Sequence, residues 1–359
     1  MPAGGIEIQY RRKAVSQGLN SALYLLYEML YTHDDLKTMQ NWSLDRKIQV
    51  SQTKILEWYA RHNNQCFVSF SGGKDSTVLA YLAARVCRAE NCPLILWFSD
   101  TGLEFPEVRE HVKTYGAWLM EHLPGLQVET VMDYPKDRKG NRISFRDVVL
   151  TYGYPVLSKR ISRRVGDVQK MGQDCYAARC FDGRETGLYD LQKWAFVIDA
   201  PFKVSDRCCD VLKKNPAKRY IRKSGRRPLI GTMACESQAR RLEWLKHGCN
   251  AFDNKKPMSR PLSFWTEQDI LSFIQKYHLP YPTVYGSITQ DEKGKLHMSG
   301  CQRTGCMFCA FGAHLEKEPN RFQRLKETHP KVWDYCMRPV KDGGLGMQEV
   351  LEYIHVKAE

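Results

Sequence analysis

Short apolar runs alternate with amphipathic stretches in the first half of the chain. Continuous or alternating apolar runs at 66–70, 93–100 and 126–133 predict buried strands. Apolar positions spaced near 3.6 residues at 75–88 and 105–123 predict helices between those strands. This alternation predicts an α/β fold with a doubly wound, mostly parallel sheet that carries helices on both faces.

The flanking segments have other patterns. Helical spacing at 14–31 and 47–62 encloses the polar stretch "THDDLKTMQNWS" and predicts an N-terminal helical arm. Further helices are expected at 153–171, 206–221, 236–248 and 267–278, and strands at 194–199 and 227–234. Thr266 is a plausible N-cap because Asp269 follows three residues later, as in a capping box.

The charge balance suggests an anionic partner. Among 359 residues, 54 Lys and Arg face 40 Asp and Glu, which gives a net charge of +14. Nucleotides, nucleic acids and membrane surfaces attract such a chain, but the cations are dispersed, so a solvated basic surface is equally compatible. The first residues contain no apolar signal segment, and no apolar run reaches about 18 residues. We therefore expect a cytoplasmic protein without a membrane partner.

Thirteen cysteines are then expected in a reducing compartment, where a disulfide framework is unusual. Clustered cysteines would bind metal or perform chemistry. Cys301, Cys306 and Cys309 form C-x4-C-x2-C, a spacing that suits zinc or an iron–sulfur cluster. The pair Cys208-Cys209 offers further ligands, although adjacent cysteines do not easily close one tetrahedral zinc site.

The stretch "FVSFSGGKDST" (67–77) joins a predicted strand to a predicted helix. Glycines at such a joint allow backbone N–H groups to approach an anion at the positive end of the helix, and Lys74 adds a charge. The stretch does not fit the Walker A pattern. A plain tight turn is the alternative, but the whole pattern favours phosphate binding.

"SFSGGKDST" resembles the pyrophosphate-binding loop of the adenine nucleotide α-hydrolase-like proteins, which include ATP sulfurylase small subunits, tRNA thiolases and phosphoadenosine-phosphosulfate (PAPS) reductases. "FSDTGLEFPEV" (98–108), "GTMACESQARR" (231–241) and "RPLSFWTEQDI" (260–270) are similar to further motifs of the reductase branch. The resemblance runs from about Leu44 to Glu349. It implies an adenine nucleotide (ATP, or APS/PAPS) at the carboxyl ends of the strands.

The resemblance also implies roles for individual residues. The catalytic candidates are Lys74, Asp75 and Arg240, and Glu104 or Asp100 is a candidate Mg²⁺ ligand. The implied nucleotide-binding residues are Ser71, Gly72, Gly73, Lys74, Asp75, Ser76, Asp100, Thr101, Gly102, Lys159, Glu236 and Arg240. Apart from the motif, Arg240 would be interpreted as a surface arginine paired with Glu236 one turn earlier.

The cysteine pattern resembles the [4Fe-4S] signature of adenosine-phosphosulfate (APS) reductases. By that resemblance Cys208, Cys209, Cys306 and Cys309 are the cluster ligands. Cys301 is then an extra thiol, or a ligand in place of Cys208. The other cysteines are interpreted as structural.

The chain departs from the family at its C-terminus. Sulfonucleotide reductases carry a nucleophilic cysteine in an E-C-G-[LI]-H tail, whereas this chain ends "GGLGMQEVLEYIHVKAE". Reduction needs a thiolate that attacks sulfur. We therefore expect an iron–sulfur enzyme that cleaves ATP between the α and β phosphates and transfers sulfur, with DNA or RNA as candidate acceptors.

Two alternatives stay open. One is a reductase that uses Cys301 or Cys336, and the other is a non-catalytic nucleotide- or nucleic-acid-binding subunit with a structural cluster. The expected domains are an N-terminal extension (1–43), a nucleotide-binding α/β domain (44–254) and a cysteine-rich helical region (255–359). A homo-oligomer or a sulfur-donor protein is a candidate assembly.

Overall fold

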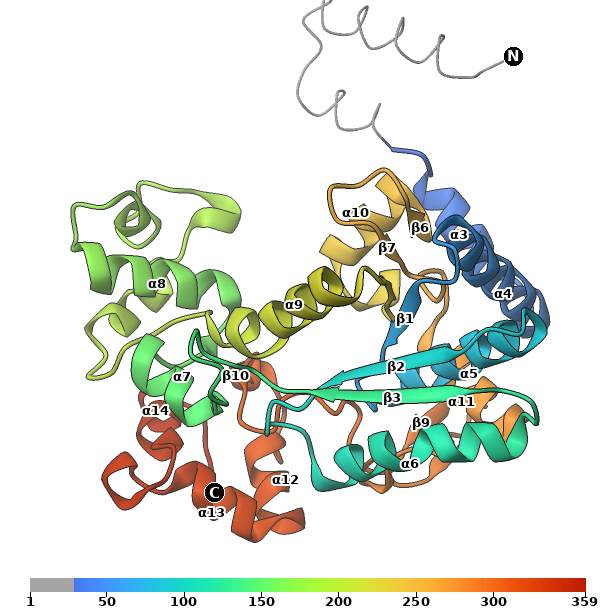
Figure 1. Ribbon diagram of the computed structural model, residues 1–359. Helices are drawn as coiled ribbons and strands as arrows, with labels where there is room; N and C mark the ends of the chain where they lie inside the picture. The colour runs from blue at the N-terminus through green and yellow to red at the C-terminus, as the bar shows by residue number, and fades with distance from the viewer. Residues whose placement is uncertain (1–28) are drawn as a thin grey trace, which may run out of the picture.

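The computed structural model describes residues 29–359, so most of the helix expected at 14–31 lies outside the described residues. The central sheet has six strands in the order β3-β2-β1-β5-β7-β6 (Figure 1). Its strands are β1 (Cys66–Ser69), β2 (Leu94–Ser99), β3 (Val128–Asp133), β5 (Arg227–Leu229), β6 (Asn250–Ala251) and β7 (Met258–Ser259). All neighbouring pairs are parallel except β6 with β7, which confirms the mostly parallel sheet.

The two faces of the sheet are covered by different helices, as the alternation of side chains along a strand requires. Val68 and Leu96 are buried against α4 (Leu44–Arg61), α5 (Lys74–Ala89), α6 (Pro106–His122) and α11 (Glu267–Tyr277). Phe67, Ile95 and Trp97 point to the opposite face and pack against α9 (Asn215–Ser224). Figure 1 shows α9 beside the strands of the sheet. The doubly wound α/β fold is therefore confirmed.

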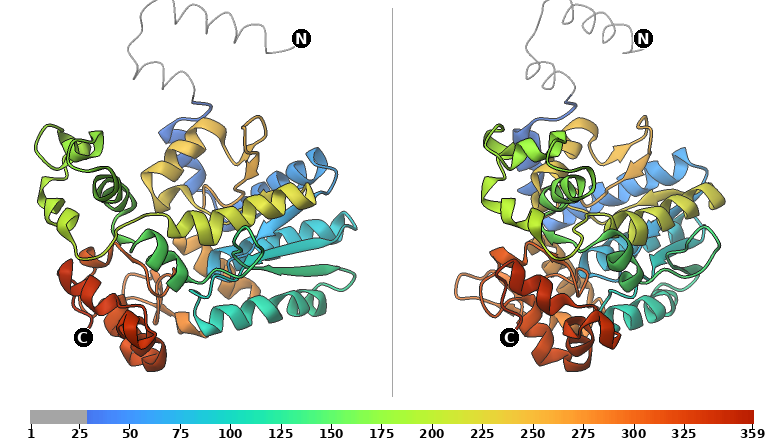
Figure 2. Two further views of the ribbon diagram at one scale, coloured as in Figure 1. Left: turned by 60° about the vertical axis from the view of Figure 1, so that its left-hand side comes forward. Right: turned by 90° about the vertical axis from the view of Figure 1, so that its left-hand side faces the viewer.

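A second hydrophobic core lies beside the sheet. Buried side chains from 145–212 pack with others from 307–358. This core contains α7 (Phe145–Tyr152), α8 (Lys159–Met171), α12 (Arg321–Thr328), α13 (Pro330–Met337) and α14 (Met347–Tyr353), with the parallel pair β4 (Val156–Leu157) and β10 (Ala310–Phe311). In Figure 2 the green α8 segment and the red C-terminal helices lie on the same side of the molecule.

One local prediction is wrong, and two other segments gain detail. Residues 194–199, expected as a strand, belong to a 3-10 helix (Gln192–Asp199) whose buried side chain is Val197. The polar stretch after Tyr31 forms α3 (His33–Gln40), which begins with a capping box between Thr32 and Asp35. The helix expected at 206–221 is present, and it contains a π-helical turn (Asp210–Lys214) that continues into α9.

The remaining elements agree with the expected pattern or are short. The predicted capping box of Thr266 and Asp269 starts α11, and α10 (Gln238–His247) follows the sheet strand β5. A small hairpin of β8 (Ile288–Gln290) and β9 (Leu296–Met298) precedes the C-terminal cysteines. Among the described residues, no helix is both long enough and apolar enough to cross a bilayer. The domain boundaries stay a prediction.

Candidate functional site

The glycine loop connects β1 to α5 at the centre of the sheet. Gly73 is the N-cap of α5, and no side chain caps the helix there. The first backbone bond of the helix runs from Thr77 N–H to Gly73 O at 3.0 Å. The N–H groups of the preceding residues therefore have no partner within the helix, which leaves the positive end of α5 available to an anion.

Glycine is required in the loop for two reasons. Gly72 has φ +73°, and a Cβ there would lie 2.7 Å from Val112 Cγ2 and 2.8 Å from Val108 Cγ1. A Cβ on Gly73 would lie 3.1 Å from the hydroxyl of Tyr285 and 3.2 Å from Thr304 Oγ1. The first glycine thus permits the turn and its packing on α6, and the second leaves room for these two hydroxyls beside the backbone.

Hydroxyl groups surround this cradle. Ser71 Oγ and Ser76 Oγ are 3.0 Å apart across the loop. Lys74 N–H donates to the Tyr285 hydroxyl at 3.3 Å, and that hydroxyl lies 2.8 Å from Thr304 Oγ1. These oxygens and N–H groups surround the start of α5 and form hydrogen bonds with one another.

The two charged residues of the loop form a buried pair. Lys74 is 3% exposed, and its Nζ lies 3.2 Å from Asp75 Oδ1 and 3.5 Å from Glu267 Oε1. Burial raises the pKa of Asp75, against the opposing effect of Lys74, and the charges of Glu236 and Glu267 raise it further. Asp75 Oδ1 is buried, and the group that faces it is the Lys74 ammonium. The loop therefore holds one ammonium group between two carboxylates, and a bound polyphosphate would change the electrostatic balance among them.

The second motif follows β2, the strand next to β1. Asp100 is buried, and its Oδ2 accepts from Arg109 at 2.7 Å and lies 3.0 Å from an Arg142 nitrogen. Thr101 donates through N–H and Oγ1 to the carboxylate of Glu104 at 3.1 and 2.8 Å. Both carboxylates thus have partners within the chain, and two guanidinium groups make Asp100 a poor ligand for Mg²⁺.

The third motif follows β5, the other neighbour of β1. A Cβ on Gly231 would lie 3.1 Å from Asp75 O, so this segment lies directly against the first turn of α5. Glu236 accepts from Met233 N–H at 2.7 Å and forms an ion pair with Arg240, whose side chain is 41% exposed. The pairing expected of a surface arginine is therefore the one observed, and Arg240 contacts Glu236 rather than the loop.

Four of the five predicted metal-ligating cysteines lie near one another. The pKa of Cys208 is raised by its hydrogen bond with Cys209, by burial, and by the charges of Cys209, Cys309 and Cys306. Lys159 at the start of α8 contacts Cys209, so the structure places this predicted nucleotide ligand beside the thiols. We call Cys208, Cys209, Cys306 and Cys309 the thiol group.

Cys301, the fifth predicted ligand, has a hydrogen-bond partner of its own. Its Sγ donates to Arg303 O at 2.8 Å, and its charged neighbours are Arg324, Arg321 and Glu316. Within residues 29–359, no set of three or more His, Cys, Asp or Glu side chains is arranged so that it could hold a metal ion as it stands. The thiol group has the chemistry of an iron–sulfur site, but its side chains are not in a ligating arrangement.

Three residues of the loop environment were not expected from the sequence. Tyr285 and Thr304 come from a segment more than 200 residues away along the chain, and nothing in their local sequence marks them. Glu267 lies within the fourth motif (260–270), so the sequence did mark the segment that brings this carboxylate to Lys74. Cys235, expected to be structural, is exposed, and Asp75 and Glu236 are among the charges that act on it.

A glycine-rich loop at the N-terminus of a helix, placed where the strand order departs in two directions from β1, defines a PP-loop α/β protein of the nucleotide-binding class. The chain belongs to the phosphoadenosine phosphosulfate reductase domain family, whose model matches residues 65–140 and 189–311, more than half of the chain. The segment 141–188, which contains α8, lies between the two matched regions.

The solved structures that match the chain are distant from it. NMN synthetase from Francisella tularensis is 14% identical with a TM-score of 0.33, over 67% of this chain and 73% of that one. Candida glabrata FMN adenylyltransferase in complex with ATP is 14% identical with a TM-score of 0.32, over 74% of this chain and 67% of that one. No curated protein matches the chain.

Proposed function

We propose that this protein binds ATP at the glycine loop, cleaves it between the α and β phosphates, and uses the activated acceptor for sulfur transfer. The observation that carries the proposal is the start of α5 at Gly73, an N-cap residue without a side chain, flanked on both sides by motifs from the neighbouring strands β2 and β5. Open parallel sheets bind ligands at this edge, and helix N-termini bind phosphate.

Each residue near the loop has a definite task in this proposal. The N–H groups at the start of α5 bind pyrophosphate oxygens, and the hydroxyls of Ser71 and Ser76 add hydrogen bonds. Lys74 leaves Asp75 and Glu267 in part and neutralises phosphate charge. Arg240 has to exchange its ion pair with Glu236 for a phosphate oxygen, which its exposure permits.

We also propose that the thiol group holds a [4Fe-4S] cluster. The supporting observation is that Cys208, Cys209, Cys306 and Cys309 meet from two distant segments, and four thiolates are the donor set of such clusters. Bound there, the cluster would supply sulfur or redox chemistry. Lys159 and Lys213, which interact with Cys209 and Cys306, would offset part of the negative charge.

A sulfonucleotide reductase is the main rival, and it needs an accessible thiolate near the nucleotide. Cys336 lies in the second core with no exposed surface, and burial raises its pKa. Cys301 is partly exposed and is the better candidate of the two. The rival reaction therefore depends on Cys301.

Product analysis separates these reactions. The anaerobically purified chain is incubated with ATP, APS or PAPS, alone and with nucleic acid, and AMP, pyrophosphate and sulfite are measured. We expect AMP and pyrophosphate from ATP, no sulfite, and loss of AMP formation in Asp75→Ala. Sulfite release from APS or PAPS that disappears in Cys301→Ser would overturn the proposal, and nucleotide binding without turnover would favour a binding subunit.

A further inference from the structure

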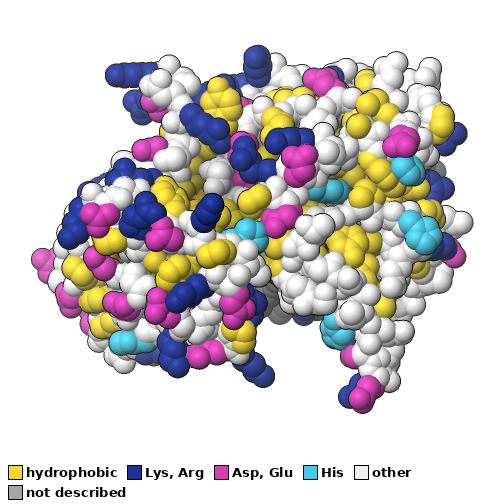
Figure 3. Space-filling view, turned by 90° about the horizontal axis from the view of Figure 1, so that it is seen from below, with side chains coloured by type: hydrophobic (Ala, Val, Ile, Leu, Met, Phe, Trp, Pro, Cys, Tyr) yellow, Lys and Arg dark blue, Asp and Glu magenta, His cyan; other side chains and the backbone are white. Residues whose placement is uncertain are grey.

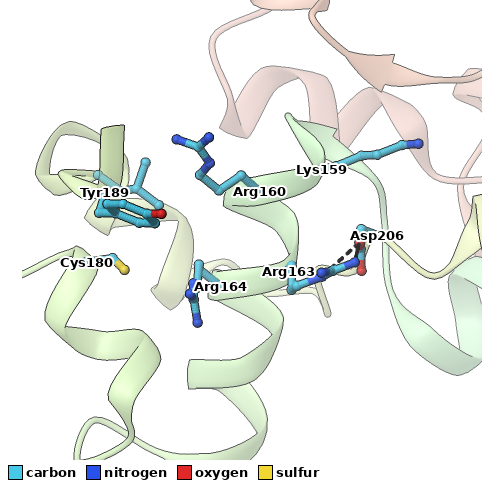
Figure 4. Close-up of a pocket in the computed structure, with 8 residues that line it drawn as sticks. Lys159, Arg160, Arg163, Arg164, Cys180, Tyr189 and Asp206 are labelled. Carbon is cyan, nitrogen blue, oxygen red and sulfur yellow. Dashed lines mark hydrogen bonds and ion pairs between the residues drawn. The ribbon is translucent and has the colours of Figure 1, made fainter. Parts of the chain in front are cut away.

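A basic pocket lies between α8, in the segment between the two matched family regions, and the start of the second matched region. Its volume is about 450 Å³, within the range of about 300–1,000 Å³ that small-molecule sites occupy. Figure 4 shows Arg160 and Arg164 projecting from α8 on the side of Tyr189 and Cys180, with Lys159 extending the other way. The pocket is lined by Lys159, Arg160, Arg163, Arg164, Cys180, Tyr189, Leu191 and Asp206.

The cations stand at an electrostatically unfavourable end of their helix. Lys159, Arg160, Arg163 and Arg164 occupy the first two turns of α8, and the first turn contains no acidic residue. The N-terminus of a helix already carries partial positive charge, so cations there are destabilising without an anion nearby. Asp206 accepts from Arg163 at 2.8 Å and belongs to the lining. A bound polyanion would relieve the remaining repulsion.

Exposed tyrosines lie among these arginines. Tyr189 is 56% exposed, and the Arg160 guanidinium lies 5.8 Å from its ring centroid. Tyr176 is 60% exposed, with Arg164 and Arg179 each 5.5 Å from its ring. Large exposed aromatic rings beside guanidinium groups are the elements that stack unpaired bases and bind the adjoining phosphates.

We propose that this pocket and the adjacent Tyr176 bind single-stranded nucleic acid. Tyr189 and Tyr176 stack bases, and the arginines of α8 contact the phosphates. The inference rests on the proposed function in one respect, because it names the class of acceptor. Lys159 links the pocket to the thiol group through Cys209, and Asp206 lies two residues before Cys208, so a strand bound on α8 runs toward the thiols.

Base stacking distinguishes this ligand from a duplex. The faces of paired bases are covered by their neighbours, so a duplex would use the arginines and gain nothing from the tyrosines. A single strand would use both. The proposal therefore predicts a ring-dependent part of the affinity in addition to a salt-dependent part.

The test measures fluorescence anisotropy of labelled 20-nucleotide single-stranded DNA, single-stranded RNA and duplex DNA with the full chain. The variants are Arg160→Ser/Arg164→Ser, Tyr189→Ala and Tyr189→Phe. Arg222→Ser/Lys223→Ser on the last turn of α9 is the matched control, because it removes the same charge from exposed positions. Circular dichroism verifies that each variant is folded.

We expect the double arginine variant and Tyr189→Ala each to weaken single-strand binding by about tenfold or more. Tyr189→Phe and the α9 control should stay within about twofold of the parent. Preference for RNA or for DNA identifies the sugar of the acceptor. No binding, equal binding to the duplex, or equal losses in the α9 control would overturn the proposal. ATP cleavage is a separate readout, so loss of AMP formation with intact strand binding contradicts the proposed function alone.

Discussion

Gly72 and Gly102 both have a positive φ, but their surroundings differ. A Cβ on Gly72 would meet two valine side chains of α6 at less than 3 Å, whereas nothing lies within 4 Å of a Cβ on Gly102. Backbone strain from a positive φ costs about 1–2 kcal/mol in either position. Only at Gly72 does a steric clash add to it.

We therefore predict that Gly72→Ala lowers the free energy of unfolding by at least about 1 kcal/mol more than Gly102→Ala does. Urea unfolding of the two variants, followed by circular dichroism, measures the difference. Equal losses of unfolding free energy would show that the valine side chains of α6 move aside without a measurable energetic cost. The loop would then not depend on close packing against α6.

His111 gives the protein a dependence on pH. It is buried on α6, its Nε2 lies 2.9 Å from Thr77 Oγ1, and desolvation lowers its pKa to about 4. The unfolded chain keeps a pKa near 6.5 for this group. Between these values the unfolded state binds the extra proton, so stability present above about pH 6.5 is lost as the pH falls toward 4.

The expected loss is about 3 kcal/mol at most, since one pKa unit corresponds to about 1.4 kcal/mol. In His111→Gln the unfolding free energy should change less between pH 7 and pH 5 than in the parent. His33→Gln, at an exposed histidine on α3, is the control and should keep the parent's slope. If the unfolding free energy of His111→Gln changes with pH as much as that of the parent, His111 is not the source of the pH dependence.

At the scale of the element, the strands show which parts of the fold can be predicted from the sequence. Strands β1, β2 and β3 were predicted within two residues, because their apolar patterns are local and continuous. The stretch 194–199 was also apolar but forms no strand, since β character depends on a partner as well as on composition.

Tertiary contacts explain the unpredicted parts of the site. Tyr285 and Thr304 reach the loop from after α11, and no local pattern encodes such a contact. Lys159 and Arg240 were placed near phosphate by family resemblance, yet their contacts are with Cys209 and Glu236. The motifs gave the position of the loop correctly, but the partners of individual side chains required the fold.

The first turns of α11 and α5 meet through Glu267 and Lys74, 3.5 Å apart. If nucleotide phosphates replace this carboxylate, its removal should favour binding. We predict that Glu267→Gln tightens ATP binding about two- to fivefold, a modest effect because Glu267 is half exposed. Isothermal titration calorimetry measures it, with Glu292→Gln on an exposed turn as the control. Weaker binding in Glu267→Gln would instead assign the carboxylate a supporting role.

At the scale of the whole molecule, the thiol group joins the two halves of the second core. Cys208 and Cys209 belong to 145–212, and Cys306 and Cys309 lie at the start of the C-terminal half. The family resemblance implied that these cysteines meet at one cluster, but the apolar patterns did not predict that the two segments pack together, because the contacts span about 100 residues. The excess of cations also remains distributed, and Figure 3 shows Lys and Arg among acidic side chains over the face seen from below.

Iron content tests the proposed cluster. Anaerobic preparations should be brown, with about four irons per chain. Cys306→Ser and Cys209→Ser should lose most of the iron, whereas Cys301→Ser should keep it, because the Cys301 thiol donates to Arg303 O and is not among the thiols that act on Cys208. A colourless protein with stoichiometric zinc would contradict the assignment, as would iron loss in Cys301→Ser alone.

The central claim is that the start of α5 binds the phosphates of an adenine nucleotide, and calorimetric ATP binding to the parent and to Gly73→Val tests it most directly. Gly73 has a φ of −79°, so valine is allowed by the backbone, but its side chain projects toward the hydroxyls of Tyr285 and Thr304 beside the first N–H groups of α5. The account predicts that the parent binds ATP, that Gly73→Val does not, and that both have the same melting temperature within a few degrees. Equal ATP affinity in the two proteins would contradict it.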